Sequence, residues 1–174
     1  MKKTTELIYS GLFVAFGLIL PQLFHLFGGT GPIFLPMHIP VLLAGFFLGA
    51  RSGLLVGLLT PILSSLTTGM PAIPILYFMM FELMTYGFLA GYLYRTRKLN
   101  IIVSLLLAMV GGRAVLAVSV FALQALLGLK LSPKGYLTGA LTTGVPGMVI
   151  QVVLIPVVVR LLDKAGVTFA RKHA

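Results

Sequence analysis

Long apolar segments, separated by short charged or glycine-rich stretches, are the feature that most restricts how this chain can fold. Only 9% of the 174 residues are charged, whereas a soluble domain has roughly a quarter. A helix needs about 20 apolar residues to cross the bilayer core, where its backbone polar groups must be satisfied internally. The pattern therefore predicts an all-α integral membrane protein with about six transmembrane helices, in which residues 1–174 form a single transmembrane domain.

Charges, glycine and proline set the predicted ends of these helices. The helices are expected at about residues 5–27, 36–50, 53–68, 73–94, 100–127 and 136–162. A glycine-rich loop is expected at 28–32 and a tight turn at 51–53, because glycine and proline interrupt regular structure. The first apolar run carries no signal-peptide cleavage motif, so we expect it to be a retained helix.

Lysine and arginine are distributed unequally between alternate loops. Ten lie on one side of the predicted membrane: Lys2, Lys3, Arg51, Arg95, Arg97, Lys98, Arg160, Lys164, Arg171 and Lys172. Two, Lys130 and Lys134, lie on the other, and Arg113 falls within a span. Loops rich in lysine and arginine stay in the cytoplasm, so we predict a multi-pass protein of the cell membrane with both termini cytoplasmic. Because the basic residues lie in loops rather than on one folded face, nucleic-acid binding is not expected.

Three polar side chains are predicted near the middle of the membrane. Glu82 lies on the fourth predicted helix, Arg113 on the fifth and Gln151 on the sixth. A lone charge at that depth costs at least about 2.5 kcal/mol, so each charge must face the bundle interior and have a partner. Two interpretations stay open and are compatible: a structural salt bridge between Glu82 and Arg113, or a ligand pocket that is open to the outside and has one of them at its floor.

Further candidates lie near the outer ends of the predicted helices. His38 follows the first outer loop, where a hydrogen bond in a pocket or at the interface is expected. Tyr77 is equally suited to a pocket wall and to an interfacial anchor, and Met70 is more typical of packing than of recognition. His25 and His38 have no cysteine or acidic neighbours in the sequence, so we expect no metal site.

The motifs of enzymes are missing from the sequence. It contains no nucleotide-binding P-loop, no H-E-x-x-H and no G-x-S-x-G. The chain has no cysteine, and of its three acidic residues only Glu82 is expected inside the membrane. We therefore expect no cofactor and no enzymatic activity. If the chain takes part in transport, another chain must supply the energy.

Small residues recur at a spacing of four. The pairs are Gly11 with Ala15 and Gly87 with Gly91, and a longer series joins Gly45, Gly49, Gly53 and Gly57. Helices in lipid associate where small residues let their backbones approach, so these positions are predicted packing surfaces. The pair on the first helix could equally serve a partner membrane protein.

Three stretches resemble a known family. They are residues 31–45 (GPIFLPMHIPVLLAG), 57–71 (GLLTPILSSLTTGMP) and 81–87 (FELMTYG). Each is similar to the substrate-binding S components of energy-coupling factor (ECF) vitamin transporters. The resemblance implies a six-helix subunit that binds a vitamin or a precursor from outside. It also implies partners, namely a transmembrane coupling protein and two ATP-hydrolysing subunits, and delivery of the ligand by toppling in the membrane.

The resemblance also implies roles for particular residues. The family's small-x-x-x-small motif for docking on the coupling protein is best matched by Gly11 and Ala15, with glycine where alanine is usual. The family pocket corresponds here to His38, Met70, Tyr77, Glu82, Arg113 and Gln151. Arg113 slightly favours a small carboxylate such as pantothenate. If Glu82 neutralises it, a neutral cobalamin precursor such as α-ribazole fits as well. The alternative is a carrier or channel that works alone.

Overall fold

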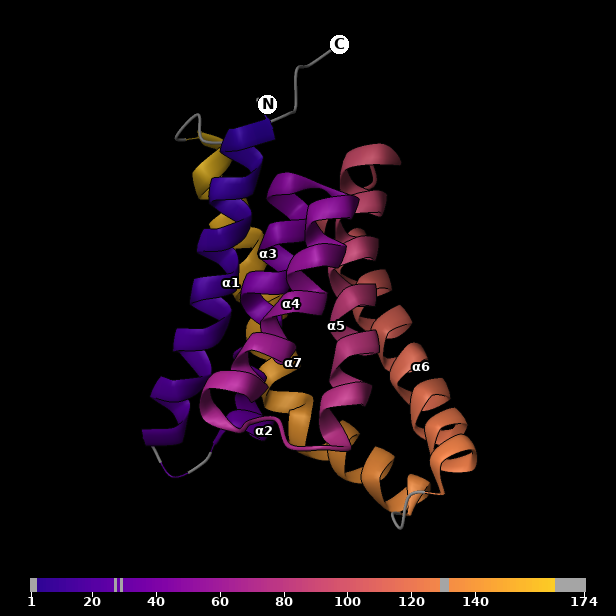
Figure 1. Cartoon of the computed structure of the whole chain (residues 1–174). Helices are drawn as coiled ribbons and strands as arrows, with labels where there is room; N and C mark the ends of the chain where they lie inside the picture. The colour runs from indigo at the N-terminus through magenta and orange to yellow at the C-terminus, as the bar shows by residue number, and fades with distance from the viewer. Residues whose placement is uncertain (1–2, 27, 29, 129–131, 165–174) are drawn as a thin grey trace.

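The computed structural model describes residues 3–26, 28, 30–128 and 132–164, with the side chain of His25 outside the description. Every regular element in these residues is helical (Figure 1). The elements are α1 (Lys3–Leu26), α2 (Gly31–Phe34), α3 (His38–Leu48), α4 (Ala50–Thr68), α5 (Ile75–Gly91), the π-helical turn η1 (Tyr92–Thr96), α6 (Ile101–Leu127) and α7 (Pro133–Lys164).

Six segments of the described chain are long and apolar enough to cross a membrane, which confirms the predicted architecture. They are Lys3–Phe24, Gly31–Leu48, Ala50–Thr68, Ile75–Thr96, Ile101–Leu127 and Pro133–Lys164. The second segment joins α2 and α3, and the fourth joins α5 and η1. The first turn of α1 and the last turn of α7 lie at the same end of the bundle (Figure 1). We call this the N-terminal end, and the opposite end, which carries α2, the loop end.

Two boundaries differ from the sequence prediction. The loop expected at residues 28–32 gives way to helix α2 from Gly31, with Pro32 in its first turn, where its missing N–H costs nothing. The turn expected at 51–53 is wrong, because these residues lie inside α4. The break falls at Gly49, whose φ of 101° suits glycine and few other residues. Phe27, the predicted end of the first helix, lies outside the described residues.

Helices α3, α4 and α5 pack backbone against backbone. A Cβ atom on Gly45 or Gly53 would overlap the carbonyl oxygen of Gly87, and one on Gly57 would overlap that of Leu83. A Cβ on Gly91 would overlap the backbone at the α3–α4 break. The packing role predicted for these small residues is therefore confirmed. We call the five glycines at positions 45, 53, 57, 87 and 91 the glycine seam.

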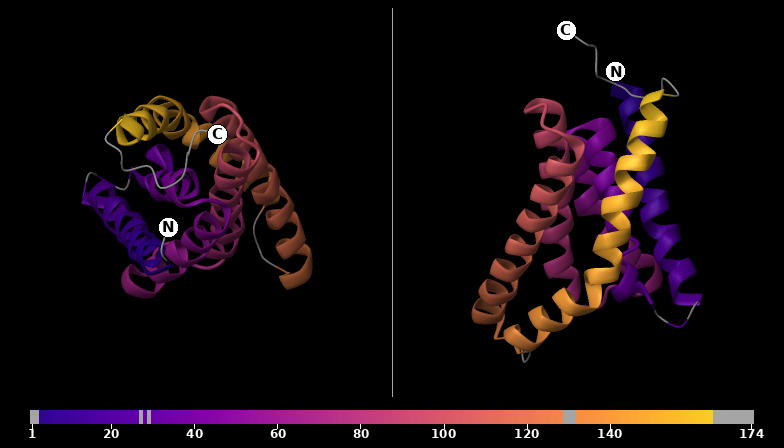
Figure 2. Two further views of the ribbon diagram at one scale, coloured as in Figure 1. Left: turned by 90° about the horizontal axis from the view of Figure 1, so that it is seen from above. Right: turned by 180° about the vertical axis from the view of Figure 1, so that it is seen from behind.

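Helices α6 and α7 are arranged more openly. They meet at the loop end and diverge toward the N-terminal end (Figure 2). Helix α6 packs along α5, whereas α7 crosses back to reach α2 and α3. Most of the buried apolar side chains form one core around α3, and a smaller cluster of Phe78, Leu116 and Val120 lies toward the loop end. Along α5 and α6, Glu82 and Arg113 fall between these two clusters.

Candidate ligand-binding site

The predicted mid-membrane charges form an ion pair. Nη1 of Arg113 lies 3.0 Å from Oε1 of Glu82, so the expected salt bridge between the two helices is present. Nε2 of His38, at the start of α3, lies 3.6 Å from the same oxygen. Only 2% of His38 and 3% of Glu82 are exposed. One carboxylate oxygen is therefore shared by two nitrogen-bearing side chains, from α3 and α6, in the interior of the bundle.

Gln151 connects α7 to this site. Its Nε2 donates a hydrogen bond of 3.5 Å to the carbonyl oxygen of Leu35, and its side chain is buried. The same carbonyl accepts the backbone N–H of His38 at 3.1 Å. Leu35 has a φ of 49°, in the left-handed region, and this conformation ends α2 and turns the chain toward α3. We call His38, Glu82, Arg113 and Gln151 the polar layer.

Several buried atoms of the polar layer make no hydrogen bond to the described residues. They are Nδ1 and Nε2 of His38, Oε1 of Glu82, Nε and Nη2 of Arg113 and Oε1 of Gln151. Of these, Nε2 of His38 and Oε1 of Glu82 face each other within the ion-pair distance given above. Buried polar groups in native proteins are nearly always hydrogen-bonded. Leaving such a group unpaired typically costs about 1–3 kcal/mol. The layer therefore offers donors and an acceptor that a polar ligand can satisfy.

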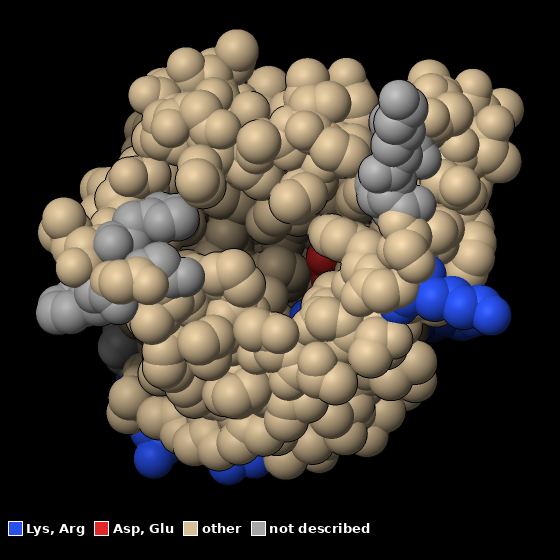
Figure 3. Space-filling model, turned by 90° about the horizontal axis from the view of Figure 1, so that it is seen from below, with Lys and Arg blue, Asp and Glu red and all other residues tan. Residues whose placement is uncertain are grey.

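The loop end of the molecule is hollowed. Viewed from below, the surface opens into a depression, with acidic side-chain atoms deep inside it and basic atoms beside them (Figure 3). Helix α2 packs closely against α7 at this end. A Cβ atom on Gly147 of α7 would lie only 2.7 Å from the carbonyl oxygen of Phe34. The Phe34 ring also contacts Phe24 of α1, with 5.2 Å between ring centroids. Helix α2 thus covers one side of the opening.

Two residues that the sequence analysis did not select border the polar layer. The ring of Tyr86 meets that of His38 edge to face, with 5.2 Å between centroids, and is almost fully buried. A Cβ on Gly144 of α7 would lie 2.9 Å from Nη2 of Arg113. Tyr86 could have been found from sequence, since it lies one helical turn after Glu82 on the same face. Gly144 gives no such signal, because its role depends on where α7 crosses.

The remaining two predicted pocket residues lie at the edge of the site. Met70 is in the link between α4 and α5, where 53% of it is exposed and its carbonyl accepts a hydrogen bond from Ser64. Tyr77 is partly buried in the first turn of α5, five residues before Glu82. At 1.5 Å per residue it lies about 7–8 Å nearer the loop end. Both remain predictions as ligand contacts.

The described residues contain no group of three or more histidine, aspartate and glutamate side chains that could hold a metal ion. The predicted docking pair lies on α1, whose apolar side chains are largely exposed. Gly11 is exposed and no atom lies within 4 Å of a Cβ built there, while Ala15 is partly buried. Gly17, by contrast, packs against Thr60 of α4. One side of α1 is therefore attached to the bundle, and Gly11 lies on a side that is open.

Comparison with known proteins gives one match. A family model described as the substrate-specific component of ECF transporters matches residues 5–159, which is most of the chain. No curated protein and no solved structure matches. The six apolar helices agree with such a subunit, and members of this family are parts of transporters and not enzymes. The chain thus belongs to the substrate-specific components of ECF transporters and is the substrate-binding subunit of such a transporter, built as a multi-pass membrane protein.

Proposed function

We propose that this subunit binds a vitamin or vitamin precursor in the polar layer, with pantothenate as the first candidate. The observation that carries the proposal is the state of Arg113. One of its nitrogens pairs with Glu82 while Nε and Nη2 are buried and unpaired. A guanidinium has five N–H donors and binds carboxylates through two parallel hydrogen bonds. A ligand carboxylate can therefore join the site without first displacing Glu82.

The ligand arrives at the loop end, which faces the outside of the cell membrane in this proposal, with both termini in the cytoplasm. The distribution of positive charge supports this orientation. Seven described basic residues belong to the N-terminal end: Lys3, Arg51, Arg95, Arg97, Lys98, Arg160 and Lys164. Lys134 belongs to the loop end. Lys2, Lys130, Arg171 and Lys172 lie outside the described residues.

The charge balance of the polar layer decides between the two candidate ligands. If Nε and Nη2 of Arg113 are available to the ligand, a carboxylate such as that of pantothenate binds to them. If Glu82 neutralises Arg113 throughout, a neutral ligand such as α-ribazole binds through the unpaired atoms of His38 and Gln151 instead. Met70 and Tyr77 would then contact the part of the ligand nearest the opening.

A thermal-shift screen of the purified chain against B vitamins and their precursors tests the assignment. A ligand at 100 times its dissociation constant adds about 2.7 kcal/mol to the apparent stability. We expect one clear shift, from pantothenate or from α-ribazole. A flat response across the panel would contradict the proposal. Flux of these compounds into liposomes that contain this chain alone would then favour a carrier or channel that needs no partner.

The energy for uptake comes, in this proposal, from a transmembrane coupling protein and two ATP-hydrolysing subunits. The open side of α1 at Gly11 and Ala15 is the proposed docking surface. Ala15→Trp is expected to spare ligand binding and to prevent co-purification with the coupling protein. Leu26→Trp is the matched control, because Leu26 lies on the same helix with 80% of its surface exposed. Retained co-purification of the Ala15 variant would place the docking surface elsewhere.

A further inference from the structure

Tyr86 is a fully buried tyrosine on α5, with only 1% of its surface exposed. Its ring meets that of His38 on α3 edge to face, with 5.2 Å between centroids and 74° between planes. On the α6 side, a Cβ atom on Gly112 would lie 3.0–3.1 Å from Cε2, Cδ2 and Cζ of the ring. That spacing is tighter than ordinary van der Waals contact, so the ring occupies the room that a glycine leaves. The ring is therefore held between α3 and α6.

The hydroxyl of Tyr86 lies beside the ion pair. Cζ, the carbon that bears this hydroxyl, is next to Gly112, the residue that precedes Arg113 on α6. Tyr86 also follows Glu82 by one turn of α5, and its hydroxyl interacts with both Glu82 and Arg113. A phenolic hydroxyl can donate one hydrogen bond and accept another. It can therefore donate to the carboxylate while it accepts from the guanidinium.

The ion pair itself is joined through single atoms. Nη1 of Arg113 meets Oε1 of Glu82, and His38 approaches that same oxygen. Two parallel hydrogen bonds between a guanidinium and a carboxylate fix the geometry of both groups, whereas a contact through one atom on each side fixes it less. The last torsion of glutamate also has a broad energy minimum. The orientation of the pair therefore depends on its other neighbours.

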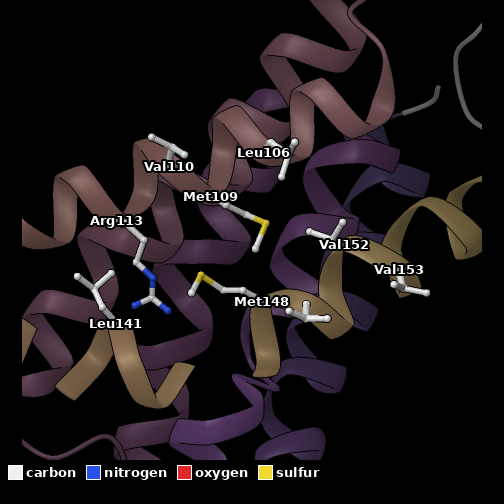
Figure 4. A pocket seen from close by; sticks show the side chains of 9 residues that line it. Leu106, Met109, Val110, Arg113, Leu141, Met148, Val152 and Val153 are labelled. Atoms are coloured by element: carbon white, nitrogen blue, oxygen red, sulfur yellow. The ribbon is translucent and has the colours of Figure 1, made fainter. Parts of the chain in front are cut away.

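The α7 side of Arg113 supplies no polar neighbour from the residues that line the space there. The side chain extends from α6 toward α7, with Leu141 and Met148 on either side (Figure 4). It borders a cleft of about 520 Å³ between the two helices, and the other eight lining residues are apolar. Nε and Nη2 of Arg113 make no hydrogen bond to the described chain. The polar contacts that orient the guanidinium therefore come from α5, through Glu82 and Tyr86.

We propose that Tyr86 is a positioning residue of the ligand site: its hydroxyl sets the orientation of the ion pair, and its ring sets that of the His38 imidazole. The inference rests on the proposed function, because it concerns the groups that a vitamin or precursor would meet. It holds for either candidate ligand, since pantothenate would use Arg113 and α-ribazole would use His38. Tyr86 acts through these groups and need not touch the ligand itself.

Removal of the hydroxyl tests the first role. Tyr86→Phe keeps the ring and should weaken binding of pantothenate or α-ribazole, whichever stabilises wild type, about tenfold. Tyr94→Phe is the matched control at the N-terminal end. The Tyr94 ring also meets a ring, that of Phe46, edge to face at 5.2 Å, and its hydroxyl lies 3.5 Å from Oδ2 of Asp163. Unchanged affinity in Tyr86→Phe would overturn the inference, and so would an equal loss of affinity in both variants.

A methyl group on Gly112 tests the position of the ring without changing any polar group. In Gly112→Ala the new Cβ would press on the Tyr86 ring, so ligand binding should again weaken. Gly111→Ala is the control on the same helix, because its Cβ would meet the end of the Leu89 side chain, which can move. Equal affinities for these two variants would overturn the role assigned to the ring.

Glu82 provides a readout that needs no ligand. The chain contains two glutamates, Glu6 and Glu82. A chain labelled with carbon-13 at the glutamate carboxyls therefore gives two NMR signals, which a Glu6→Gln variant assigns. Tyr86→Phe should shift the Glu82 signal, and Tyr94→Phe should leave it in place. A Glu82 signal that does not move in Tyr86→Phe would overturn the inference.

The two readouts separate this inference from the proposed function. A flat vitamin screen together with a shifted Glu82 signal would contradict the vitamin assignment and support Tyr86 as the residue that orients the ion pair. A clear vitamin hit, with the same affinity and the same Glu82 signal in Tyr86→Phe as in wild type, would overturn the inference and leave the vitamin-binding subunit standing.

Discussion

The glycine seam and the α6–α7 pair are built in opposite ways. In the seam, α3, α4 and α5 touch through backbone atoms, and no space remains for a single methyl group on Gly53 or Gly87. Between α6 and α7 there is a cleft of about 520 Å³, bordered by an arginine with unpaired donors. Close packing of this kind gives a structure few alternatives, whereas a cleft with unused polar atoms can accept a ligand. Stability is therefore expected to rest mainly on the glycine seam, and ligand recognition, in the function proposed above, on the residues around Arg113.

A methyl group in the seam should have the largest effect on stability. Gly87→Ala forces α5 away from α4, because the new Cβ meets the backbone of Gly53 and not a flexible side chain. We expect a loss above the ~1–3 kcal/mol typical of overpacking, and little monodisperse protein after purification. Gly139→Ala on α7 is the control, since its Cβ would have no neighbour within 4 Å. It should be neutral or stabilise by up to about 1 kcal/mol. Similar melting temperatures for the two variants would break the comparison.

Removing one charge from the polar layer should have the next largest effect. Arg113→Gln leaves the buried carboxylate of Glu82 without its cation, which typically costs about 3–5 kcal/mol. The double variant Arg113→Gln with Glu82→Gln should recover most of that loss while ligand binding stays absent. Thermal unfolding of the two variants and of wild type measures this. A double variant as unstable as the single one would show that the pair does not act as a compensating unit.

A methyl group beside Arg113 should affect binding more than stability. In Gly144→Ala the new Cβ would lie 2.9 Å from Nη2 of Arg113 and 3.1 Å from Cδ1 of Leu35. Both neighbours are side chains that can shift, so the fold should persist while the guanidinium moves. We expect about tenfold weaker ligand binding, or about 1.4 kcal/mol. Binding titrations alongside Gly139→Ala test this. A Gly144 variant that binds normally but melts much earlier would assign Gly144 to the structural region.

The smallest expected effect concerns the start of α6. The Asn100 side chain accepts a hydrogen bond of 2.9 Å from the backbone N–H of Ile102 and caps the helix. Asn100→Ala should cost about 1 kcal/mol, whereas Asn100→Ser should be nearly neutral because serine also caps. Melting temperatures of the two variants provide the test. A loss as large as that of Gly87→Ala would contradict the view that the glycine seam contributes more to stability than the end of a single helix.

Sequence reasoning predicted the parts of this molecule that the bilayer enforces. Six spans follow from the need to satisfy the backbone in lipid, and the Glu82–Arg113 pair follows from the cost of burying a lone charge. The packing role of the glycines at four-residue spacing follows from the same environment. Each of these constraints is local or depends only on depth, so it can be read without knowing how the helices are arranged.

The rest depended on tertiary structure. The four residues of α2 are too few to form a stable helix alone, and contacts with Phe24 and with Gly147 of α7 hold them. The choice of Gly49 over residues 51–53 as the break depends on how α3 and α4 fit against α5. The position of Gly144 against Arg113 likewise depends on the crossing of α7. No period or motif in the sequence encodes these contacts.

The backbone conformation of Leu35 bears on how easily α2 could move away from α7. Its left-handed conformation, which costs a residue with a side chain about 1–2 kcal/mol, holds while its carbonyl accepts from His38 and Gln151. If α2 were to move away from α7 and these hydrogen bonds were broken, the Leu35 torsion could relax and recover that energy. Strain in the Leu35 backbone would then favour this movement. A strain of about 1 kcal/mol would make movement of α2 away from α7 about fivefold more favourable than it would be with glycine at this position. Leu35 would thereby affect the opening of the site without touching a ligand.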